Sequence, residues 1–177
     1  SGGFDPVHVG HLRMFQGAQN LSDKVILLLN NDEWLIKKKG KPFMNQDQRK
    51  EILDQFISIS EVIIQTYSDK SSSEAIKDFV KNNPNKTICY CNGGDRSNIK
   101  KILEADVCKK LGVVLEFGVG GDKKVESSSQ LTKNYLGNIE TRPWGSYQII
   151  AKNNGYQIKE INVSYGSKLS LQKHSNR

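Results

Sequence analysis

The sequence predicts an α/β fold in which a parallel sheet carries helices on both of its faces. Segments 24–30 and 61–65 have continuous apolar centres of strand length, as in strands that are buried on both sides. Segments with apolar residues at helical spacing alternate with these runs along the chain. The 177 residues, 36% of them hydrophobic, are enough to bury the core of such a domain. No apolar run approaches the roughly 18 residues of a membrane helix, so a membrane span is not expected.

The first third of the chain supplies two helices around the first strand. A helix is expected at about 11–20, followed by the strand at 24–30 and a short helix at 31–39. Asn45 and Gln48 then have the spacing of an N-cap and its capping-box partner. They precede an apolar stripe at helical spacing that consists of Ile52, Leu53, Phe56 and Ile57.

The middle of the chain continues the alternation. After the strand at 61–65, Ser71 and Glu74 have capping-box spacing ahead of a helix that Pro84 and Asn85 end. The remaining elements are a strand at 87–91, a helix that carries Ile99, Leu103, Val107 and Leu111 and is capped by Gly112, a strand at 113–117 and a helix at 127–135.

The last forty or so residues differ in character from the rest. Segment 137–143 has the composition of a linker, and 144–150 and 156–163 have the patterns of two strands. Asn154-Gly155 lies between these two segments and is a strong hairpin signal. A third strand is expected to begin at 169–171. The sequence therefore predicts a domain at 1–136, a linker at 137–143 and the start of a β domain at 144–177.

The segment from Gly3 to His11 holds two of the three histidines of the chain, at a point where a loop is predicted to become a helix. The free N–H groups and the positive end of the dipole at a helix N-terminus favour an anion such as phosphate. His8 and His11 can add hydrogen-bond donors there, and Gly10 leaves room for a ligand. The alternative, two surface histidines at a helix start, would be favoured for a bare His-x-x-His, but the whole string favours a functional site.

The net charge bears on whether the protein binds nucleic acid, and the cysteines bear on the redox compartment. A net charge of +7 raises the question of nucleic acid. However, the basic residues outside one compact cluster are scattered without interleaved aromatics, so nucleic acid is disfavoured. The cluster, which suits a polyphosphate and a solvated charge run about equally well, consists of Lys37, Lys38, Lys39 and Lys41. Cys89, Cys91 and Cys108 form no metal-binding or disulfide pattern, which favours a reducing, cytoplasmic setting.

The string Gly2-Gly3-Phe4-Asp5-Pro6-x-His8-x-Gly10-His11 resembles the His-x-Gly-His signature of the nucleotidyltransferase superfamily. That superfamily includes glycerol-3-phosphate cytidylyltransferases, heptose 1-phosphate adenylyltransferases and nicotinate mononucleotide adenylyltransferases. The resemblance covers most of 1–136 and implies a Rossmann-like domain. It also implies a strand ahead of the motif, which this chain is expected to lack.

The resemblance implies a set of site residues. His8, His11 and Lys39 would be catalytic. Residues expected to contact or shape the nucleotide site are Gly3, Phe4, Asp5, Gly10, Arg49, Gly94, Asp95, Ser127, Ser128 and Ser129. Ser127 to Ser129 stand where the superfamily has a helix N-terminus that holds the outer phosphates. The chain departs from the pattern at Glu126, where an isoleucine is usual, and lacks the arginine that can precede this motif, so Lys123 or Lys124 would supply the charge.

The tail is similar to a different family. Arg142-Pro143-Trp144-Gly145-Ser146-Tyr147 and the later Ser170 to His174 resemble the start of the cupin of type II mannose-6-phosphate isomerases. In that family histidines after the glutamine bind a metal. Here His174 matches the first of them and Asn176 stands at the second, so no metal is expected at the tail.

The resemblance implies transfer of a nucleoside monophosphate from CTP or ATP to a phosphorylated sugar or polyol, in polysaccharide biosynthesis. Pyrophosphate would leave, and Mg²⁺ would accompany the nucleoside triphosphate. The base, the acceptor and a homodimer stay open. Three alternatives also stay open: adenylyl transfer to a mononucleotide such as nicotinate mononucleotide, a module that binds nucleotide or RNA without turnover, and an isomerase activity of the tail.

Overall fold

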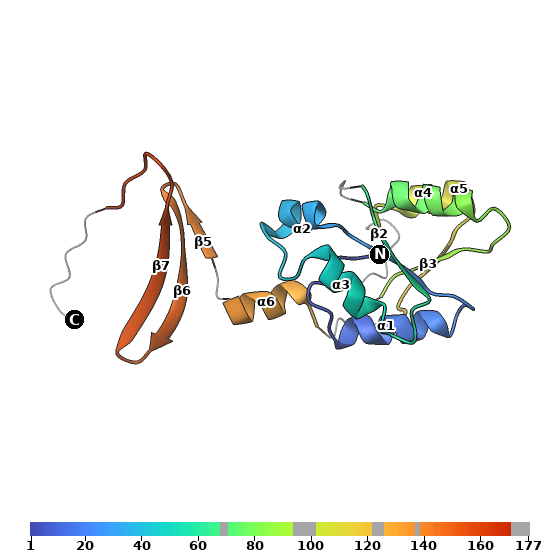
Figure 1. The fold of residues 1–177 in the computed structure, drawn as a ribbon, viewed down its shortest axis with the longest axis horizontal. Helices are drawn as coiled ribbons and strands as arrows, with labels where there is room; N and C mark the ends of the chain where they lie inside the picture. Colours follow the sequence, from blue (N-terminus) through green and yellow to red (C-terminus); the bar gives the residue numbers. More distant parts are fainter. Residues whose placement is uncertain (68–70, 94–101, 122–125, 137–138, 171–177) are drawn as a thin grey trace. The chain divides into compact units, whose positions relative to one another are not determined.

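The computed structural model describes residues 1–67, 71–93, 102–121, 126–136 and 139–170 (Figure 1). The chain divides into two compact units, Ser1–Ser129 and Gln130–Arg177. No helix among the described residues is both long enough and apolar enough to cross a membrane.

The first unit alternates helices and strands, which confirms the predicted fold class. Its elements are α1 (Val9–Gln19), β1 (Ile26–Leu29), α2 (Asp32–Lys39), α3 (Gln46–Leu53), β2 (Glu61–Ile64), α4 (Ser73–Asn82), β3 (Cys89–Cys91), α5 (Ala105–Leu111) and β4 (Val114–Glu116), and α6 (Ser128–Leu136) crosses into the second unit. Gly112 caps α5 in a left-handed conformation, with φ of 69°, as its sequence position predicted.

The strands form two parallel pairs, β1 with β2 and β3 with β4, where one continuous sheet was predicted. Ser1 and Gly2 lie between the pairs. The Gly2 N–H donates to the carbonyl of Leu28 at 3.0 Å, and the Gly2 carbonyl accepts from Asn30 N–H at 2.9 Å. On the other side, the hydroxyls of Ser1 and Tyr90 are 2.6 Å apart. Ser1 and Gly2 thus connect the two pairs, and strand residues of both pairs share one hydrophobic cluster.

Each face of the paired strands buries its own hydrophobic core. Leu27, Leu29 and Val62 pack on one face with Phe15 of α1 and Leu53 of α3. The alternate strand residues, including Leu28, Ile63 and Tyr90, pack on the other face with Ile76 of α4 and Cys108 of α5. In Figure 1, α4 and α5 lie above the strands and α1 lies below them. The predicted cover of helices on both faces is confirmed.

The two predicted capping boxes had different outcomes. The Asn45 side chain accepts from Gln48 N–H at 2.9 Å and the Gln48 side chain accepts from Asn45 N–H at 3.3 Å, so this box is confirmed. The box of Ser71 and Glu74 is wrong: Ser72 is the N-cap of α4, and Glu74 pairs with Lys77.

A contact distant in sequence sets the start of α4. The buried carboxylate of Glu104 accepts from Ser72 N–H at 2.9 Å and fixes this residue at the helix start. A local capping pattern cannot anticipate that partner, because the two residues are 32 positions apart.

The second unit is an antiparallel sheet in the order β5 (Ile139–Arg142), β6 (Gly145–Asn153) and β7 (Tyr156–Val163). Asn153 pairs with Tyr156, so the predicted hairpin at Asn154-Gly155 is confirmed. Two predictions are wrong. Segment 139–142 of the expected linker forms β5 because it pairs with β6, and Leu169 and Ser170 are not in a strand. Leu171, His174 and Asn176 lie outside the described residues.

Candidate functional site

The predicted pair of histidines lies at the start of a helix, as expected. His8 is the N-cap of α1 in an extended conformation, and His11 is in the first helical turn. The two imidazole rings stack with centroids 3.7 Å apart and an interplanar angle of 20°. The backbone N–H of His8 donates to His11 Nδ1 at 3.3 Å. The stack and this hydrogen bond hold both rings beside the positive end of the α1 dipole.

His11 is electrically neutral at physiological pH. Burial lowers its pKa from 6.5 to about 3, and the positive charges of His8, Lys39 and the N-terminus act in the same direction. Because Nδ1 accepts the hydrogen bond from His8, the ring proton must be on Nε2. His11 can therefore donate one hydrogen bond from Nε2 to a ligand without bringing a charge into the site.

Phe4 supports the His11 ring from below the loop. Its ring meets the His11 imidazole edge-on at a centroid distance of 4.8 Å and the Phe15 ring at 5.5 Å. Phe4 is buried and has a left-handed backbone with φ of 48°. Such a conformation costs a non-glycine residue about 1 to 2 kcal/mol, so packing of this ring must hold the turn. Phe4 thus shapes the site through His11.

Asp5 and Lys39 join this loop to the end of α2 and to the segment that follows it. The buried Asp5 carboxylate accepts from the N–H groups of Phe43 and Met44, both at 2.8 Å. In return, Lys39 Nζ donates to the backbone carbonyl of Asp5 at 2.8 Å. Burial lowers the pKa of Lys39, the Asp5 charge opposes this, and the Arg49 charge adds to it. The predicted Lys39 is therefore brought to the histidine loop, beside His11.

Arg49 lies under the two loops and is fully buried. Its Nη1 donates to the carbonyls of Gly3 at 2.6 Å and Asn30 at 2.8 Å. Its Nε donates to the Met44 carbonyl at 3.1 Å, and Nη2 contacts the Asp32 carboxylate at 2.7 Å. With these bonds Arg49 holds the loop backbones, which favours a positioning role over the direct nucleotide contact that was predicted.

The serine-rich start of α6 meets the histidine loop. Ser128 Oγ donates to the Pro6 carbonyl at 2.8 Å, and the Glu126 carboxylate accepts from Ser127 N–H at 3.1 Å. A Cβ atom added at Gly10 would lie 3.1 Å from the His8 ring and 3.9 Å from Glu126 N. A side chain at position 10 would therefore crowd the His8 ring near the segment that leads into α6. Of the remaining predicted residues, Gly94, Asp95, Lys123 and Lys124 lie outside the described residues.

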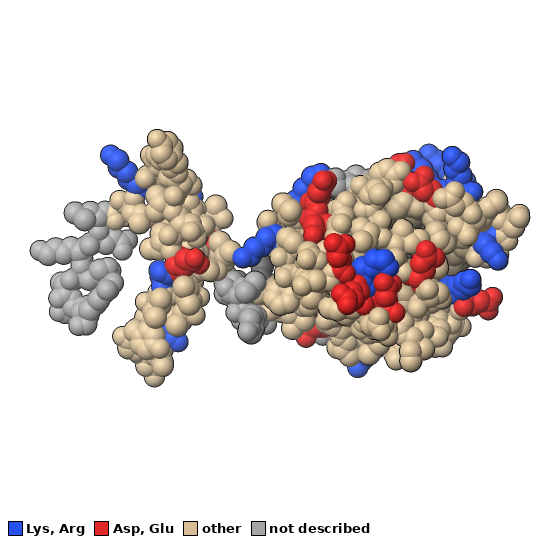
Figure 2. All heavy atoms as spheres, in the orientation of Figure 1, with Lys and Arg blue, Asp and Glu red and all other residues tan. Residues whose placement is uncertain are grey.

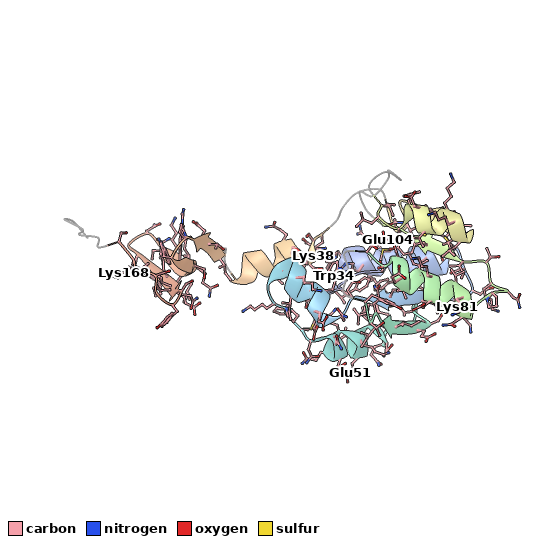
Figure 3. All side chains as sticks on the ribbon, turned by 90° about the horizontal axis from the view of Figure 1, so that it is seen from above. Trp34, Lys38, Glu51, Lys81, Glu104 and Lys168 are labelled. Carbon is pink, nitrogen blue, oxygen red and sulfur yellow. The ribbon has the colours of Figure 1, made fainter. Side chains whose placement is uncertain are left out.

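The basic residues are dispersed on the face seen in Figure 2. Lys and Arg side chains alternate there with Asp and Glu over the first unit and form no continuous basic patch on that face. Lys38 lies over the ring of Trp34 on α2, with Nζ 4.4 Å from the ring centroid (Figure 3). The lysines of one cluster thus have different surroundings, since Lys39 is half-buried in the site and Lys38 is exposed.

Sequence reasoning noted the polar segment that begins at Asn92 but missed two further buried polar residues at strand ends, Asn30 and Gln65. Asn30, Gln65 and Asn92 are each buried and each follows an apolar strand directly. That position is a signal that could have identified them, because ligands of open α/β sheets bind outside the carboxyl ends of the strands. Glu104, labelled in Figure 3, contacts the same region through Ser72.

The pKa of His11 predicts how stability depends on pH. Between pH 6.5 and about 3 the unfolded chain protonates His11 and the folded chain does not. The free energy of unfolding should therefore fall with falling pH, by up to about 1.4 kcal/mol per pH unit from this group before solvent screening reduces it. Urea unfolding of the wild type and of His11→Gln between pH 4 and 7 measures the difference. Equal pH dependence of the two proteins would contradict the expectation.

Comparison with known proteins gives two family matches. The model of the cytidylyltransferase-like family matches residues 1–107, and that of the C-terminal region of mannose-6-phosphate isomerase matches residues 131–177. The bifunctional protein HldE of Aliarcobacter butzleri is 34% identical over 116 residues, which are 64% of this chain and 22% of that protein. Glycerol-3-phosphate cytidylyltransferase of Bacillus spizizenii is 34% identical over 80 residues, 45% of this chain and 59% of that protein.

Two further proteins also match this chain. FAD synthase of Pyrococcus abyssi is 36% identical over 64 residues, 36% of this chain and 43% of that protein. A solved structure, a lipopolysaccharide core biosynthesis protein of Thermoplasma volcanium, has a TM-score of 0.48 and 20% identity over 66% of this chain and 88% of that one. The chain therefore spans less than two thirds of the length of each of these three curated relatives.

Proposed function

The chain belongs to the cytidylyltransferase-like family, and from this premise we propose that its first unit is a nucleotidyltransferase. A phosphate oxygen of a phosphorylated sugar or polyol would attack the α-phosphorus of CTP or ATP. The new phosphorus–oxygen bond forms as the bond to the β-phosphate breaks, and pyrophosphate leaves. The observation that carries the proposal is the stacked pair of His8 and His11 at the α1 N-terminus, with Lys39 beside it.

Catalysis of this reaction requires positioning and stabilisation of charge more than covalent participation of a side chain. The His11 Nε2–H would donate to a phosphoryl oxygen and strengthen its bond as charge develops there. His8 would be the second donor, and the N-termini of α1 and α6 would face the outer phosphates. Gly94, Asp95 and the serines at 127–129 would contact the nucleotide, and Arg49, Asp5 and Phe4 would hold the loops.

Magnesium would enter as part of the nucleotide substrate. Both Asp5 carboxylate oxygens already accept backbone N–H groups, and no metal-binding cluster of three His, Cys, Asp or Glu side chains occurs within the described residues. This donor set fits Mg²⁺ held mainly by phosphate oxygens and water, which is how the ion commonly binds with nucleotides.

Lys39 should mainly affect nucleotide affinity. Its ammonium group, half-buried beside the histidines, would contact the triphosphate. Lys39→Ala is therefore expected to raise the KM for the nucleoside triphosphate by about 10-fold or more, the loss expected when a charged hydrogen bond is removed. Lys38→Ala is the matched control, because Lys38 packs on Trp34 in the same helix turn. Equal KM values for the two variants would contradict a role of Lys39 in nucleotide binding. Lys39 would then be one of a cluster of lysines that interact mainly with solvent.

The acceptor is proposed from the relatives and from the tail. One relative is named glycerol-3-phosphate cytidylyltransferase, and the tail matches a sugar phosphate isomerase family. These matches support a phosphorylated sugar or polyol. Adenylyl transfer to a mononucleotide is the second candidate, and the FAD synthase match favours including flavin mononucleotide beside nicotinate mononucleotide.

The test is pyrophosphate release measured with CTP, ATP, GTP and UTP against a panel of acceptors. The panel holds glycerol, ribitol, heptose and mannose phosphates and the two mononucleotides. Release that depends on one sugar or polyol phosphate is the expected result. Release with a mononucleotide alone would establish the second candidate. Saturable nucleotide binding without pyrophosphate release for any combination of nucleotide and acceptor would identify a binding module and overturn the proposal.

A further inference from the structure

Three buried carboxamides end three parallel strands of the first unit: Asn30 after β1, Gln65 after β2 and Asn92 after β3. Their backbone N–H groups extend the strand ladders, donating to the carbonyls of Gly2 at 2.9 Å, Leu29 at 2.8 Å and Glu116 at 2.8 Å, respectively. The exposed fractions of the three residues are 7%, 4% and 3%. The three residues therefore mark the carboxyl edge of the sheet, where a ligand of this fold class binds.

All three carboxamides lie on the same face of the strands. Leu28, Ile63 and Tyr90 pack against α4 and α5, and strand residues two positions apart share a face. Asn30, Gln65 and Asn92 each follow one of these residues by two positions. The contact from Gln65 Nε2 to Ser72 Oγ at the start of α4, 3.2 Å, agrees with this assignment.

Asn92 differs from the other two in its hydrogen bonding. Gln65 Nε2 donates to Asn30 Oδ1 at 2.6 Å, so these two side chains are hydrogen-bonded to each other. Asn92 Nδ2 is buried and has no hydrogen-bond partner within the part of the chain that the structure describes. The backbone of Asn92 is fixed on both sides, because its N–H donates to Glu116 and its carbonyl accepts from Val119 N–H at 3.1 Å. Such an unsatisfied buried donor is rare and calls for an explanation.

We propose that Asn92 is a specificity-determining residue that hydrogen-bonds the base of the nucleotide. This inference rests on the proposed function. Asn92 Nδ2 would donate to a ring nitrogen or a ring carbonyl oxygen, which are the acceptors at the edges of cytosine and adenine. A base fits better than a phosphate because Asn92 is neutral and continues the apolar face of Tyr90, whereas the cationic Lys39, at the end of α2, lies beside the histidines at the start of α1.

The test is Asn92→Leu, which keeps the approximate size of the side chain and removes the donor. The KM for the preferred nucleoside triphosphate is expected to rise about 10-fold, with a smaller change in kcat and no change in the KM for the acceptor. The Tm without ligand should stay equal or rise, since an unsatisfied buried donor is lost. A residue with only a structural role would not combine weaker nucleotide binding with an unchanged or higher Tm.

Two further variants keep the test decisive. Asn92→Asp has the shape of asparagine and should also raise the nucleotide KM, which covers the case that the leucine variant does not fold. Tyr90→Phe is the control on the same face of β3; loss of its hydroxyl contact with Ser1 should lower the Tm and leave the nucleotide KM unchanged.

An unchanged nucleotide KM in both Asn92 variants would overturn the inference and leave the transferase proposal standing. A KM that rises for the acceptor alone would also overturn it, since Asn92 would then contact the acceptor. If the wild type releases no pyrophosphate, the proposed transfer fails, and the Asn92 inference is decided by the shift in Tm that CTP or ATP causes. A smaller shift in Asn92→Leu than in the wild type would support it, and no shift in the wild type would overturn it.

Discussion

His11→Ala is expected to lower kcat about 10²- to 10³-fold, the usual cost of losing one well-placed donor to a developing oxyanion. The donor is Nε2–H, because Nδ1 accepts from His8 and the lowered pKa keeps the ring neutral. The donor does not titrate between pH 5 and 8, so the loss in kcat should be the same across that range. Steady-state pyrophosphate release at pH 5.5, 7 and 8 measures it.

Two conservative variants test which nitrogen of His11 carries the function. The amide nitrogen of glutamine reaches the position of Nε2, whereas that of asparagine reaches only the position of Nδ1. His11→Gln should therefore retain more activity than His11→Asn, and His11→Asn should resemble His11→Ala. The reverse order would show that Nδ1 is the donor. A folded His11→Ala protein with near-normal kcat would remove His11 from the catalytic residues.

Arg49→Leu is expected to have the largest effect on stability, a loss of about 3 to 5 kcal/mol in the free energy of unfolding. The substitution leaves the buried carbonyl of Asn30 and the partly buried carbonyls of Gly3 and Met44 without their donor and the Asp32 carboxylate without its cation. Domains of this size commonly have only about 5 to 15 kcal/mol of net stability. The variant should therefore unfold at a much lower urea concentration than the wild type.

Lys50→Leu is the matched control for Arg49. Lys50 is the next residue of α3 and forms an ion pair with Asp54 at 2.7 Å, the same distance as in the pair of Arg49 and Asp32. The side chains of Lys50 and Asp54 are both partly exposed, however. Exposed pairs contribute roughly 0 to 1 kcal/mol, so this variant should remain close to the wild type in urea. Equal losses for Arg49→Leu and Lys50→Leu would show that the buried network does not stabilise the loops.

The sequence was sufficient for features that depend on nearby residues. Helical and strand periodicity located the helices and strands of the first unit approximately, because each pattern reports which face of a short segment is buried. The predicted stripes extended too far: α3 ends at Leu53, before Phe56 and the exposed Ile57, and α5 begins after the exposed Leu103. Asn45 and Gln48 identified a helix start, and Asn154-Gly155 identified a hairpin, since the hydrogen bonds of a cap or a turn close within a few residues. The histidine string likewise identified a helix start, because His8 is the N-cap of α1.

Tertiary structure decided the features that depend on distant partners. Arg49 was predicted as a cation for the nucleotide, but it is buried against Gly3, 46 positions away. The hydrogen bond from Ser72 N–H to Glu104 fixes the start of α4. Residues 139–142 form a strand because they pair with β6. Burial lowers the pKa of His11, so its ring is neutral. The unsatisfied amide of Asn92 is equally invisible in a residue string. Burial and hydrogen-bond satisfaction are properties of the packed environment, and residues far apart in the chain create that environment.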